Sequence, residues 1–379
     1  MPCKTIALIT ANATTLLNFR APLIRTLHHR GIKVVALAPN FDGQIRAEVS
    51  ALGAIPVDCP ISRTGMNPLV DVINTLRMAR ILRQIRPNIT LGYSIKPVIF
   101  GSLAAWMARV PRRFAMVEGL GFVFTPRSQR LSLVRRMLKR MVLTLYKIGF
   151  SCAQKAIFLN PDDLNEFVAA DVIPMHKTFL LGGIGVDLEQ WQKAPAVIEP
   201  VTFVLAARLL HEKGIGEYVE AARIVKKDYP NTRFILLGGL DENPGAIKQA
   251  KVEGWVAEGV LEWHGHVPVR PFLVGCSVFV LPSYREGVPT STQEAMATGR
   301  AVVTTDAPGC RETVQDGLNG FLVPPRNSKA LAERMARFVE QPHLIEVMGE
   351  ASNKMARERF DVHKVNKRLI DLLFGPSGD

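Results

Sequence analysis

An alternation of short apolar runs with helical patterns constrains the fold of this chain most, and residues 278–305 show it clearly. Val278–Leu281 is apolar throughout, which predicts a strand buried on both faces. The helical pattern that follows stops at Gly299, a residue suited to a left-handed C-terminal cap. Ala301–Thr305 is again a short apolar run and predicts the next strand. Strand–helix–strand units of this kind build a parallel sheet, so an α/β fold is expected.

The same alternation is found near the N-terminus and in the middle of the chain. Ile6–Ile9, the helical pattern of Leu16–Arg30 and the apolar Val34–Ala38 predict one strand–helix–strand unit. Thr202–Ala206 opens another. The glycine fingerprint of a dinucleotide-binding turn is absent after the first strand, where a small polar loop stands instead. The pattern therefore predicts parallel sheets in two units, without a dinucleotide site.

Length and charge divide the chain into two halves. The 379 residues are enough for two domains with full cores. We predict one domain at residues 1–190, joined by a C-terminal helix at about 361–379, and a second domain at residues 191–360. Residues 1–190 carry 24 Lys and Arg against 11 Asp and Glu, whereas residues 191–379 carry 23 of each. The first half therefore holds the whole net charge of +13, which favours anionic partners.

Cysteines and apolar runs exclude several protein classes. The five cysteines are scattered and form no CxxC pair, so we expect no disulfide framework, no thiolate metal site and a reducing compartment. No uncharged apolar stretch reaches the ~18–20 residues that span a bilayer. The first ten residues suit a strand better than a signal peptide. These features predict a cytoplasmic protein.

One helical pattern, residues 128–150, combines an apolar stripe with many basic residues and contains no acid. This pattern is typical of a helix that lies on an anionic membrane surface. The alternatives are a helix packed on its own domain with a solvated basic face, and a groove for nucleic acid. The last is disfavoured because no aromatic residues interleave the charges.

The loop between the strand at 278–281 and the following helix carries the chemistry expected of an anion site. The first N–H groups and the dipole of a helix favour a phosphate. Glu286 precedes that helix and Glu294 lies in its first turns, and a carboxylate accepts hydrogen bonds from vicinal sugar hydroxyls. Together they predict a sugar-diphosphate ligand held at both ends. The alternative is that Ser291 and Glu294 form only a capping box.

A longer pattern around these glutamates resembles the donor-site signature of glycosyltransferase family 4. It comprises Glu286 and Glu294 with seven residues between them, then Ala295–Ala297, the Pro308–Gly309 loop and the segment 316–323. Members of this family are retaining enzymes of GT-B fold. The resemblance therefore implies two Rossmann-like domains facing each other across a cleft.

The resemblance also implies a set of donor-site roles in the second domain. Arg208 and Lys213 flank a turn at a strand end and would bind and stabilise the donor diphosphate. Glu286 would hold the donor sugar and Glu294 the ribose. The remaining donor-binding candidates are Gly287, Val288, Pro289, Thr290, Ser291, His266 and Val267. His264 and His266 lack a third ligand, so no metal is expected, and no other cofactor is.

Candidate acceptor-binding residues lie in the first domain. The sequences around Lys96 and Gly119–Gly121 resemble family members that extend glycans on a lipid-diphosphate carrier. Many members place a histidine near the reacting centre, and this chain offers Glu118 there instead. Glu118 is therefore a candidate catalytic residue, although an ion-pair role is the alternative. The acceptor-binding candidates are Asn12, Asn18, Arg20, Lys96, Gly119 and Gly121.

The sequence thus predicts a metal-independent, retaining glycosyltransferase. Its donor would be a nucleotide-diphosphate sugar, most simply a UDP-sugar, and its acceptor a lipid-linked or oligosaccharide glycan in polysaccharide assembly. It would lie at the inner face of the cell membrane in contact with anionic lipid and would bind no nucleic acid. Two alternatives stay open: a UDP-sugar epimerase of the same architecture, and a non-catalytic basic module that binds membrane or nucleic acid.

Overall fold

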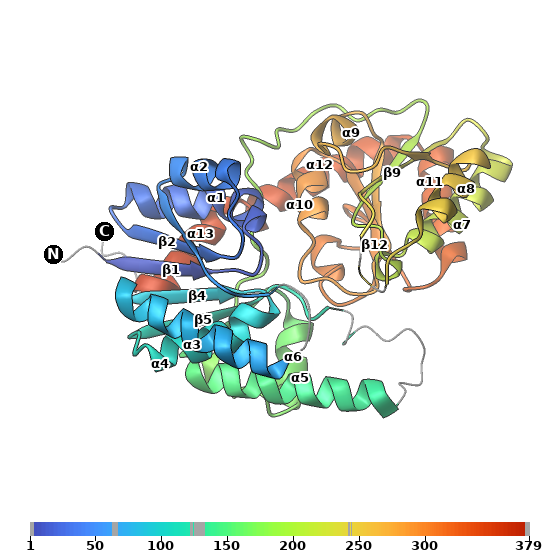
Figure 1. Ribbon diagram of the computed structural model, residues 1–379. Coiled ribbons are helices and arrows are strands. Elements are labelled where there is room, and N and C mark those ends of the chain that lie inside the picture. Colours follow the sequence, from blue (N-terminus) through green and yellow to red (C-terminus); the bar gives the residue numbers. More distant parts are fainter. Residues whose placement is uncertain are drawn as a thin grey trace. The chain divides into compact units, whose positions relative to one another are not determined.

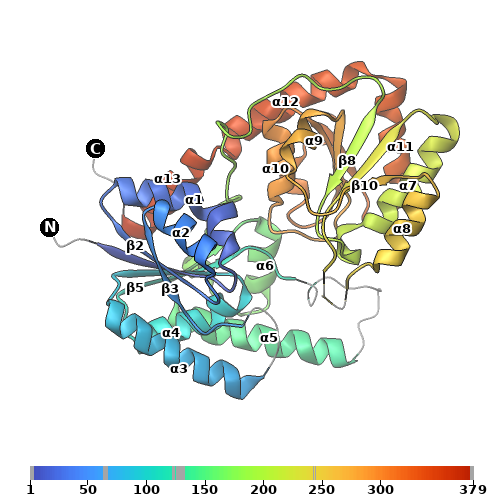
Figure 2. The same ribbon diagram turned by 45° about the horizontal axis from the view of Figure 1, so that its top comes forward.

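The computed structural model describes residues 4–62, 67–121, 124, 133–241, 243 and 245–375 of the chain. It divides into two compact units (Figures 1 and 2). Unit 1 comprises Met1–Ile184 with Val365–Asp379, and unit 2 comprises Gly185–Lys364. The chain therefore returns to unit 1 after completing unit 2.

The described part of unit 1 contains a seven-stranded sheet in the order β3-β2-β1-β4-β5-β6-β7. All neighbouring strands in it are parallel. Continuous apolar runs form these strands because helices bury both faces of the sheet. The strands are Thr5–Ile9 (β1), Lys33–Ala38 (β2), Ala54–Asp58 (β3), Ile89–Tyr93 (β4), Arg112–Val117 (β5), Lys155–Phe158 (β6) and Thr178–Leu180 (β7).

Helices cover both faces of this sheet. Figures 1 and 2 show α1 and α2 on one side and α3, α4 and α5 together on the other. The helices of unit 1 are Thr14–His29 (α1), Gly43–Ala51 (α2), Pro68–Ile85 (α3), Ser102–Met107 (α4), Leu133–Cys152 (α5), Pro161–Ala169 (α6) and Val362–Phe374 (α13). A π-helical turn at Pro97–Gly101 leads into α4.

Unit 2 has a six-stranded parallel sheet in the order β10-β9-β8-β11-β12-β13. Its strands are Thr202–Ala206 (β8), Arg233–Leu237 (β9), Glu262–Trp263 (β10), Val278–Leu281 (β11), Ala301–Thr305 (β12) and Gly320–Val323 (β13). Its helices are Ile215–Asp228 (α7), Gln249–Ala257 (α8), Arg270–Val274 (α9), Thr290–Ala297 (α10), Ser328–Glu340 (α11) and His343–Arg359 (α12).

Alternate residues of β8 show how the sheet of unit 2 is buried. Phe203 and Leu205 join the cluster packed with α7 and α11, whereas Val204 and Ala206 join the cluster packed with α9 and α10. All four side chains are buried. Because successive side chains point to opposite faces, an unbroken apolar run is what a strand covered on both sides requires.

Several predicted elements agree with the structure to the residue. The strands predicted at 202–206, 278–281 and 301–305 are β8, β11 and β12. Gly299 follows α10 with φ +84°, which confirms the left-handed cap. The basic helix predicted at 128–150 is α5, Leu133–Cys152, and the prediction for residues 128–132 lies outside the described residues. None of the helices in the described part of the chain has the length and hydropathy needed to cross a bilayer.

Candidate functional site

The candidate donor site lies at the carboxyl edge of the sheet in unit 2, where the strand order reverses. From β8 the chain continues to β9 and β10 on one side, and then to β11, β12 and β13 on the other. Loops that follow β8 and β11 therefore diverge, and such a switch point is where parallel sheets bind ligands. The loops concerned are residues 207–214 and 282–289.

Close backbone contacts join three loops at this edge. The Tyr284 N–H donates to the Glu212 carbonyl at 2.9 Å, and the Glu286 N–H donates to the Pro308 carbonyl at 3.0 Å. Gly309 has φ +75°, and a Cβ there would come within 2.1 Å of the Glu286 carbonyl oxygen. Only glycine fits this contact, so the loops after β8, β11 and β12 form one framework.

Lys213 and Glu286 meet within this framework. The Lys213 Nζ lies 2.5 Å from Glu286 Oε1, and the two side chains are 17% and 14% exposed. Gly214 follows with φ +71°, and a Cβ there would lie 2.0 Å from the Pro282 carbonyl oxygen. The loop after β8, which carries Lys213, therefore packs directly against the loop after β11. The structure brings together two residues that are 73 positions apart in the chain and were both predicted to contact the donor.

The N-terminus of α10 has no side-chain cap. The helix begins at Thr290 after Pro289, whose backbone is extended. Ser291 lies inside the first turn, so the capping box considered from the sequence does not form. The N–H groups of Thr290, Ser291 and Thr292 have no acceptor among the described residues. Unsatisfied N–H groups and the helix dipole make this end of α10 suited to a phosphate.

Glu294 lies one turn further along α10. Burial raises the pKa of its carboxyl group from the ordinary 4.5 to about 8. Within the part of the chain that the structure describes, no cation is close enough to oppose this shift. Hydroxyl donors that a ligand brings would stabilise this half-buried carboxyl group in its ionised form.

Arg208, the second predicted diphosphate contact, lies further along the same edge. Its Nη1 is 3.1 Å from Oδ2 of Asp241, beyond the end of β9, and its side chain is 54% exposed. His266 is also exposed and lies against Gly239, where an added Cβ would be 3.3 Å from the His266 Cβ. Val267 is half-buried beside it. The structure therefore pairs the two predicted cations with different carboxylates.

Among the described residues, no three His, Cys, Asp or Glu side chains are grouped for a metal ion. His264 has contacts within unit 2. Its Nε2 lies 3.6 Å from Glu262 Oε2, and its ring centroid lies 4.8 Å from that of Phe272.

In unit 1 the strand order reverses between β1 and β4, and the predicted acceptor residues follow the strands of this edge. Arg20 on α1 is 3% exposed and forms an ion pair with Glu118, just beyond β5. The Arg20 guanidinium also lies 4.7 Å from the centroid of the Tyr93 ring. Burial raises the pKa of Glu118, and the adjacent Arg20 opposes that shift. Two predicted site residues are thus partners of each other.

Lys96 also has protein partners. Its Nζ lies 2.7 Å from Oδ1 of Asp71 on α3 and 2.6 Å from the Ser62 hydroxyl oxygen. The side chains of Lys96 and Asp71 are 13% and 10% exposed. This buried pair was not predicted from the sequence.

The other acceptor candidates lie around the same edge. Asn12 follows β1, and its Oδ1 accepts hydrogen bonds from the Thr14 N–H at 3.1 Å and the Thr14 hydroxyl at 2.9 Å. Asn18 is exposed on α1. Gly119 and Gly121 have φ +149° and +68°, which favour glycine.

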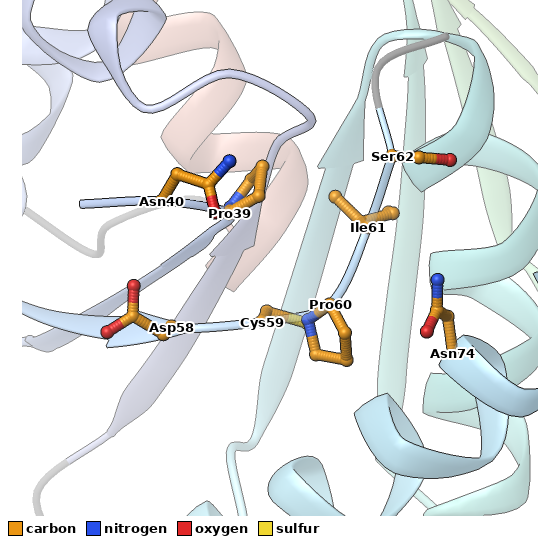
Figure 3. A pocket seen from close by; sticks show the side chains of 8 residues that line it. All are labelled: Pro39, Asn40, Asp58, Cys59, Pro60, Ile61, Ser62 and Asn74. Atoms are coloured by element: carbon orange, nitrogen blue, oxygen red, sulfur yellow. The ribbon is translucent and has the colours of Figure 1, made fainter. Parts of the chain in front are cut away.

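Sequence analysis missed a cavity of about 490 Å³ beside this edge. Figure 3 shows it between the segments that follow β2 and β3 and the helix α3. Polar side chains lining it come from Asn40, Asp58, Ser62 and Asn74. Small polar residues directly after two parallel strands were the signal that could have indicated it.

Comparisons with known proteins agree with this architecture. Residues 200–341 match the family described as Glycosyl transferases group 1, and residues 5–157 match the family described as Glycosyl transferase 4-like. The two matches lie in unit 2 and unit 1 respectively.

Two curated relatives cover most of the chain. One is the N,N'-diacetylbacillosaminyl-diphospho-undecaprenol alpha-1,3-N-acetylgalactosaminyltransferase of Campylobacter jejuni, 29% identical over 89% of this chain and 90% of that protein. Another is the UDP-Gal:alpha-D-GlcNAc-diphosphoundecaprenol alpha-1,3-galactosyltransferase of Escherichia coli, 24% identical over 80% of this chain and 79% of that protein.

A solved structure shows the same fold. Anabaena HepE in complex with UDP superimposes with a TM-score of 0.75 at 17% identity, covering 97% of this chain and 99% of that chain. The predicted GT-B fold of two parallel-sheet α/β domains is therefore confirmed.

Proposed function

We propose a reaction from the premise that this chain belongs to the glycosyltransferases that combine a 4-like domain with a group 1 domain. In this reaction the protein transfers a sugar from a UDP-sugar to a lipid-diphosphate-linked glycan with retention of configuration. The names of the Campylobacter and Escherichia relatives give sugars on diphospho-undecaprenol as their substrates. HepE was solved with UDP. A Staphylococcus aureus relative, 25% identical over 76% of this chain and 77% of that protein, is named for capsular polysaccharide biosynthesis.

The observation that carries the proposal is the grouping of three unlike features at one edge of unit 2. Lys213 supplies a cation, the open N-terminus of α10 supplies N–H donors, and Glu294 supplies a carboxyl group with a raised pKa. A nucleotide-diphosphate sugar carries the matching groups, namely two phosphates and the vicinal hydroxyls of a ribose. In this assignment Glu294 holds the ribose, and Glu286 holds the donor sugar beside the diphosphate.

The reaction breaks the bond between the anomeric carbon and the diphosphate oxygen. A new bond forms from the acceptor hydroxyl oxygen to the same carbon, and the hydroxyl proton passes to the departing diphosphate. The protein's contribution is to position the reactants and to stabilise the charge that grows on the leaving group. Lys213 and the first N–H groups of α10 do this directly. Arg208 joins them when it exchanges Asp241 for a phosphate.

Unit 1 supplies the acceptor side of this proposal. Its carboxyl edge holds Asn12, Gly119 and Gly121, and the cavity shown in Figure 3 opens beside it. Amide and carboxylate side chains such as Asn40 and Asp58 are suited to sugar hydroxyl groups. At this edge the charges of Arg20 and Glu118 neutralise each other.

A membrane-bound acceptor also requires the enzyme to reach the bilayer surface. Helix α5 exposes Val134, Met137 and Met141 on one face, and its Arg136 and Arg140 are also exposed. A helix of this kind is suited to anionic lipid headgroups. We therefore place the protein at the inner face of the cell membrane, held there by α5.

The test is product analysis with a panel of UDP-sugars, with and without a synthetic lipid-diphosphate sugar. We expect a new glycosidic bond only when the acceptor is present, with the anomeric configuration of the donor as read by NMR coupling constants. Isomerised UDP-sugar formed without acceptor would instead identify an epimerase. An inverted product would overturn the proposal of retention.

A further inference from the structure

Helix α3 exposes an apolar stripe that the sequence reading did not identify. Leu69, Val72, Ile73 and Leu76 are 76%, 55%, 49% and 42% exposed. Their spacing of three, one and three residues places all four on one face of the helix. Scattered exposed apolar side chains are normal, but four on two successive turns of one helix form a patch.

The opposite face of α3 already holds the helix in place. Met78, Ala79 and Leu82 are buried in a core cluster with residues of β1, β2 and α4. The exposed stripe therefore takes no part in packing α3 against unit 1.

The single acid of α3 is turned away from this stripe. Asp71 is 8% exposed, and its carboxylate is paired with Lys96 at 2.7 Å. Further along the same exposed face come Arg80 and Arg83, with Arg77 beside them. The outward face of α3 thus begins apolar, continues basic and carries no carboxylate of its own.

A similar surface lies nearby on α5. Val134, Met137, Met141 and Ile148 are exposed at intervals of three, four and seven residues, which again describe one helix face. Helix α4 contacts both α3 and α5, and its Trp106 is 55% exposed. Figures 1 and 2 both place the three helices on one side of unit 1.

We propose that the outward faces of α3, α4 and α5 form one docking surface for an anionic lipid bilayer, with the first two turns of α3 as a second insertion site beside α5. Charge complementarity selects this partner, because the exposed stripes of α3 and α5 contain no acid of their own and both helices carry exposed arginines, which match a negatively charged interface. An exposed tryptophan between them is typical of the membrane–water boundary. The inference rests on the membrane contact proposed for α5 and extends it.

Two attachment helices have a consequence that one does not. A protein held by α5 alone could rotate about that helix axis, whereas contacts through α3 as well fix which face of unit 1 meets the bilayer. The cavity in Figure 3 is lined in part by Asn74 of α3, so this orientation also fixes its position relative to the lipid surface.

The experiment measures binding of the full chain to vesicles of phosphatidylglycerol and phosphatidylethanolamine by flotation. The test variant replaces Leu69, Val72, Ile73 and Leu76 by Ser. The matched control replaces four exposed apolar residues of unit 2, Ile224, Val256, Val274 and Val347, by Ser. A third variant replaces Val134, Met137 and Met141 of α5 by Ser. UDP binding and the thermal unfolding midpoint of each variant verify the fold.

We expect the α3 variant to lose about tenfold or more in vesicle partitioning, because it removes apolar side chains that insert between headgroups. The control should bind like the wild type. A single Ile73→Cys, labelled with an environment-sensitive dye in a Cys3→Ser background, should shift to the blue on vesicles.

Each contrary outcome has a distinct meaning. If only the α5 variant is released and the Ile73 label does not shift, α3 does not insert, although the membrane contact of α5 stands. If the wild type does not bind anionic vesicles, the proposed membrane contacts of α3 and α5 are both wrong. Transfer to a short-chain acceptor in solution still tests the proposed activity. If the α3 variant changes the oligomeric state and not vesicle binding, the stripe is an interface between copies.

Discussion

The carboxyl edges of the two sheets have the same topology but differ in which of their polar groups have partners within the protein. In unit 1, Arg20 is paired with Glu118, and Lys96 with Asp71. In unit 2, Lys213 is likewise paired with Glu286 and Arg208 with Asp241, but among the described residues no cation opposes the raised pKa of Glu294, and the first N–H groups of α10 have no acceptor. Glu294 and these N–H groups can therefore receive their partners from a ligand. The comparison therefore supports the proposal that the charged donor binds to unit 2.

The two lysines at these edges provide the largest test of this difference. Lys213 and Lys96 are similarly buried and each is paired with a carboxylate. Lys213→Ala should lower kcat for sugar transfer by about 10²–10³-fold with a smaller change in donor Kd, because the contact strengthens as the diphosphate leaves. Lys96→Ala should affect stability more than donor chemistry, since it leaves Asp71 buried without its partner.

Steady-state kinetics and donor titration of both variants check this prediction. Unchanged turnover in Lys213→Ala would mean that this lysine takes no part in the mechanism. An equal loss of kcat in Lys213→Ala and Lys96→Ala would mean that the two edges do not differ in this respect.

The second test concerns the carboxylates of unit 2. Glu286→Gln and Glu294→Gln keep the shape of each side chain but leave a group that cannot ionise. We expect at least about tenfold slower transfer from each, because hydroxyl contacts to a carboxylate are stronger than those to an amide. Normal kinetics in both variants would mean that neither glutamate binds the donor.

The third test concerns stability at the edge of unit 1. Arg20→Met should destabilise the fold by about 3 kcal/mol, because it leaves Glu118 next to an apolar side chain. Glu118→Gln should cost less, since an amide still accepts a hydrogen bond from Arg20. Urea unfolding of the two variants measures the difference. If Glu118→Gln instead abolishes transfer in a stable protein, Glu118 acts in catalysis and is more than the ion-pair partner of Arg20.

The fourth test uses the raised pKa of Glu294. The folded pKa of about 8 lies above the ordinary 4.5, so the folded protein without ligand loses stability as the pH rises from about 4.5 to 8. Ribose hydroxyls favour the ionised form, so UDP binding should tighten as the pH rises toward 8 and should release protons near pH 7. Calorimetry in buffers of different ionisation enthalpy detects this release. Glu294→Gln should abolish it, and an unaltered release would assign the protons to another group.

The smallest expected effect concerns α5. Arg136→Gln with Arg140→Gln should weaken binding to anionic vesicles severalfold at low salt and little at high salt. Lys227→Gln with Lys248→Gln, in unit 2, is the matched control of equal charge change. Equal binding by both variants would show that the basic flank of α5 does not face lipid.

Local patterns made the fold and the donor loop predictable. Strands such as Val278–Leu281 are continuous apolar runs because both faces are buried, and Gly299 had to follow α10 because only a left-handed residue ends it there. The proposed donor residues Glu286 and Glu294 lie eight positions apart, within one loop and helix. Their grouping therefore depends little on the rest of the chain.

Long-range pairing was not predictable in the same way. Arg20 and Glu118 are 98 positions apart, and Lys96 and Asp71 are 25 apart on different elements. Periodicity identifies a helix but does not tell which of its apolar residues are buried. For that reason the exposed stripe that begins at Leu69 became visible only when the packing of α3 was known.

Hydrogen–deuterium exchange on addition of UDP tests the central claim most directly, because it reports both edges at once. We predict slower exchange in residues 208–215 and 284–294 of unit 2, where the β8 loop, the β11 loop and the start of α10 meet. Residues 10–20 and 92–121 of unit 1 should exchange as before. Protection confined to unit 1, or none at UDP concentrations that saturate binding, would contradict the assignment of the donor to unit 2.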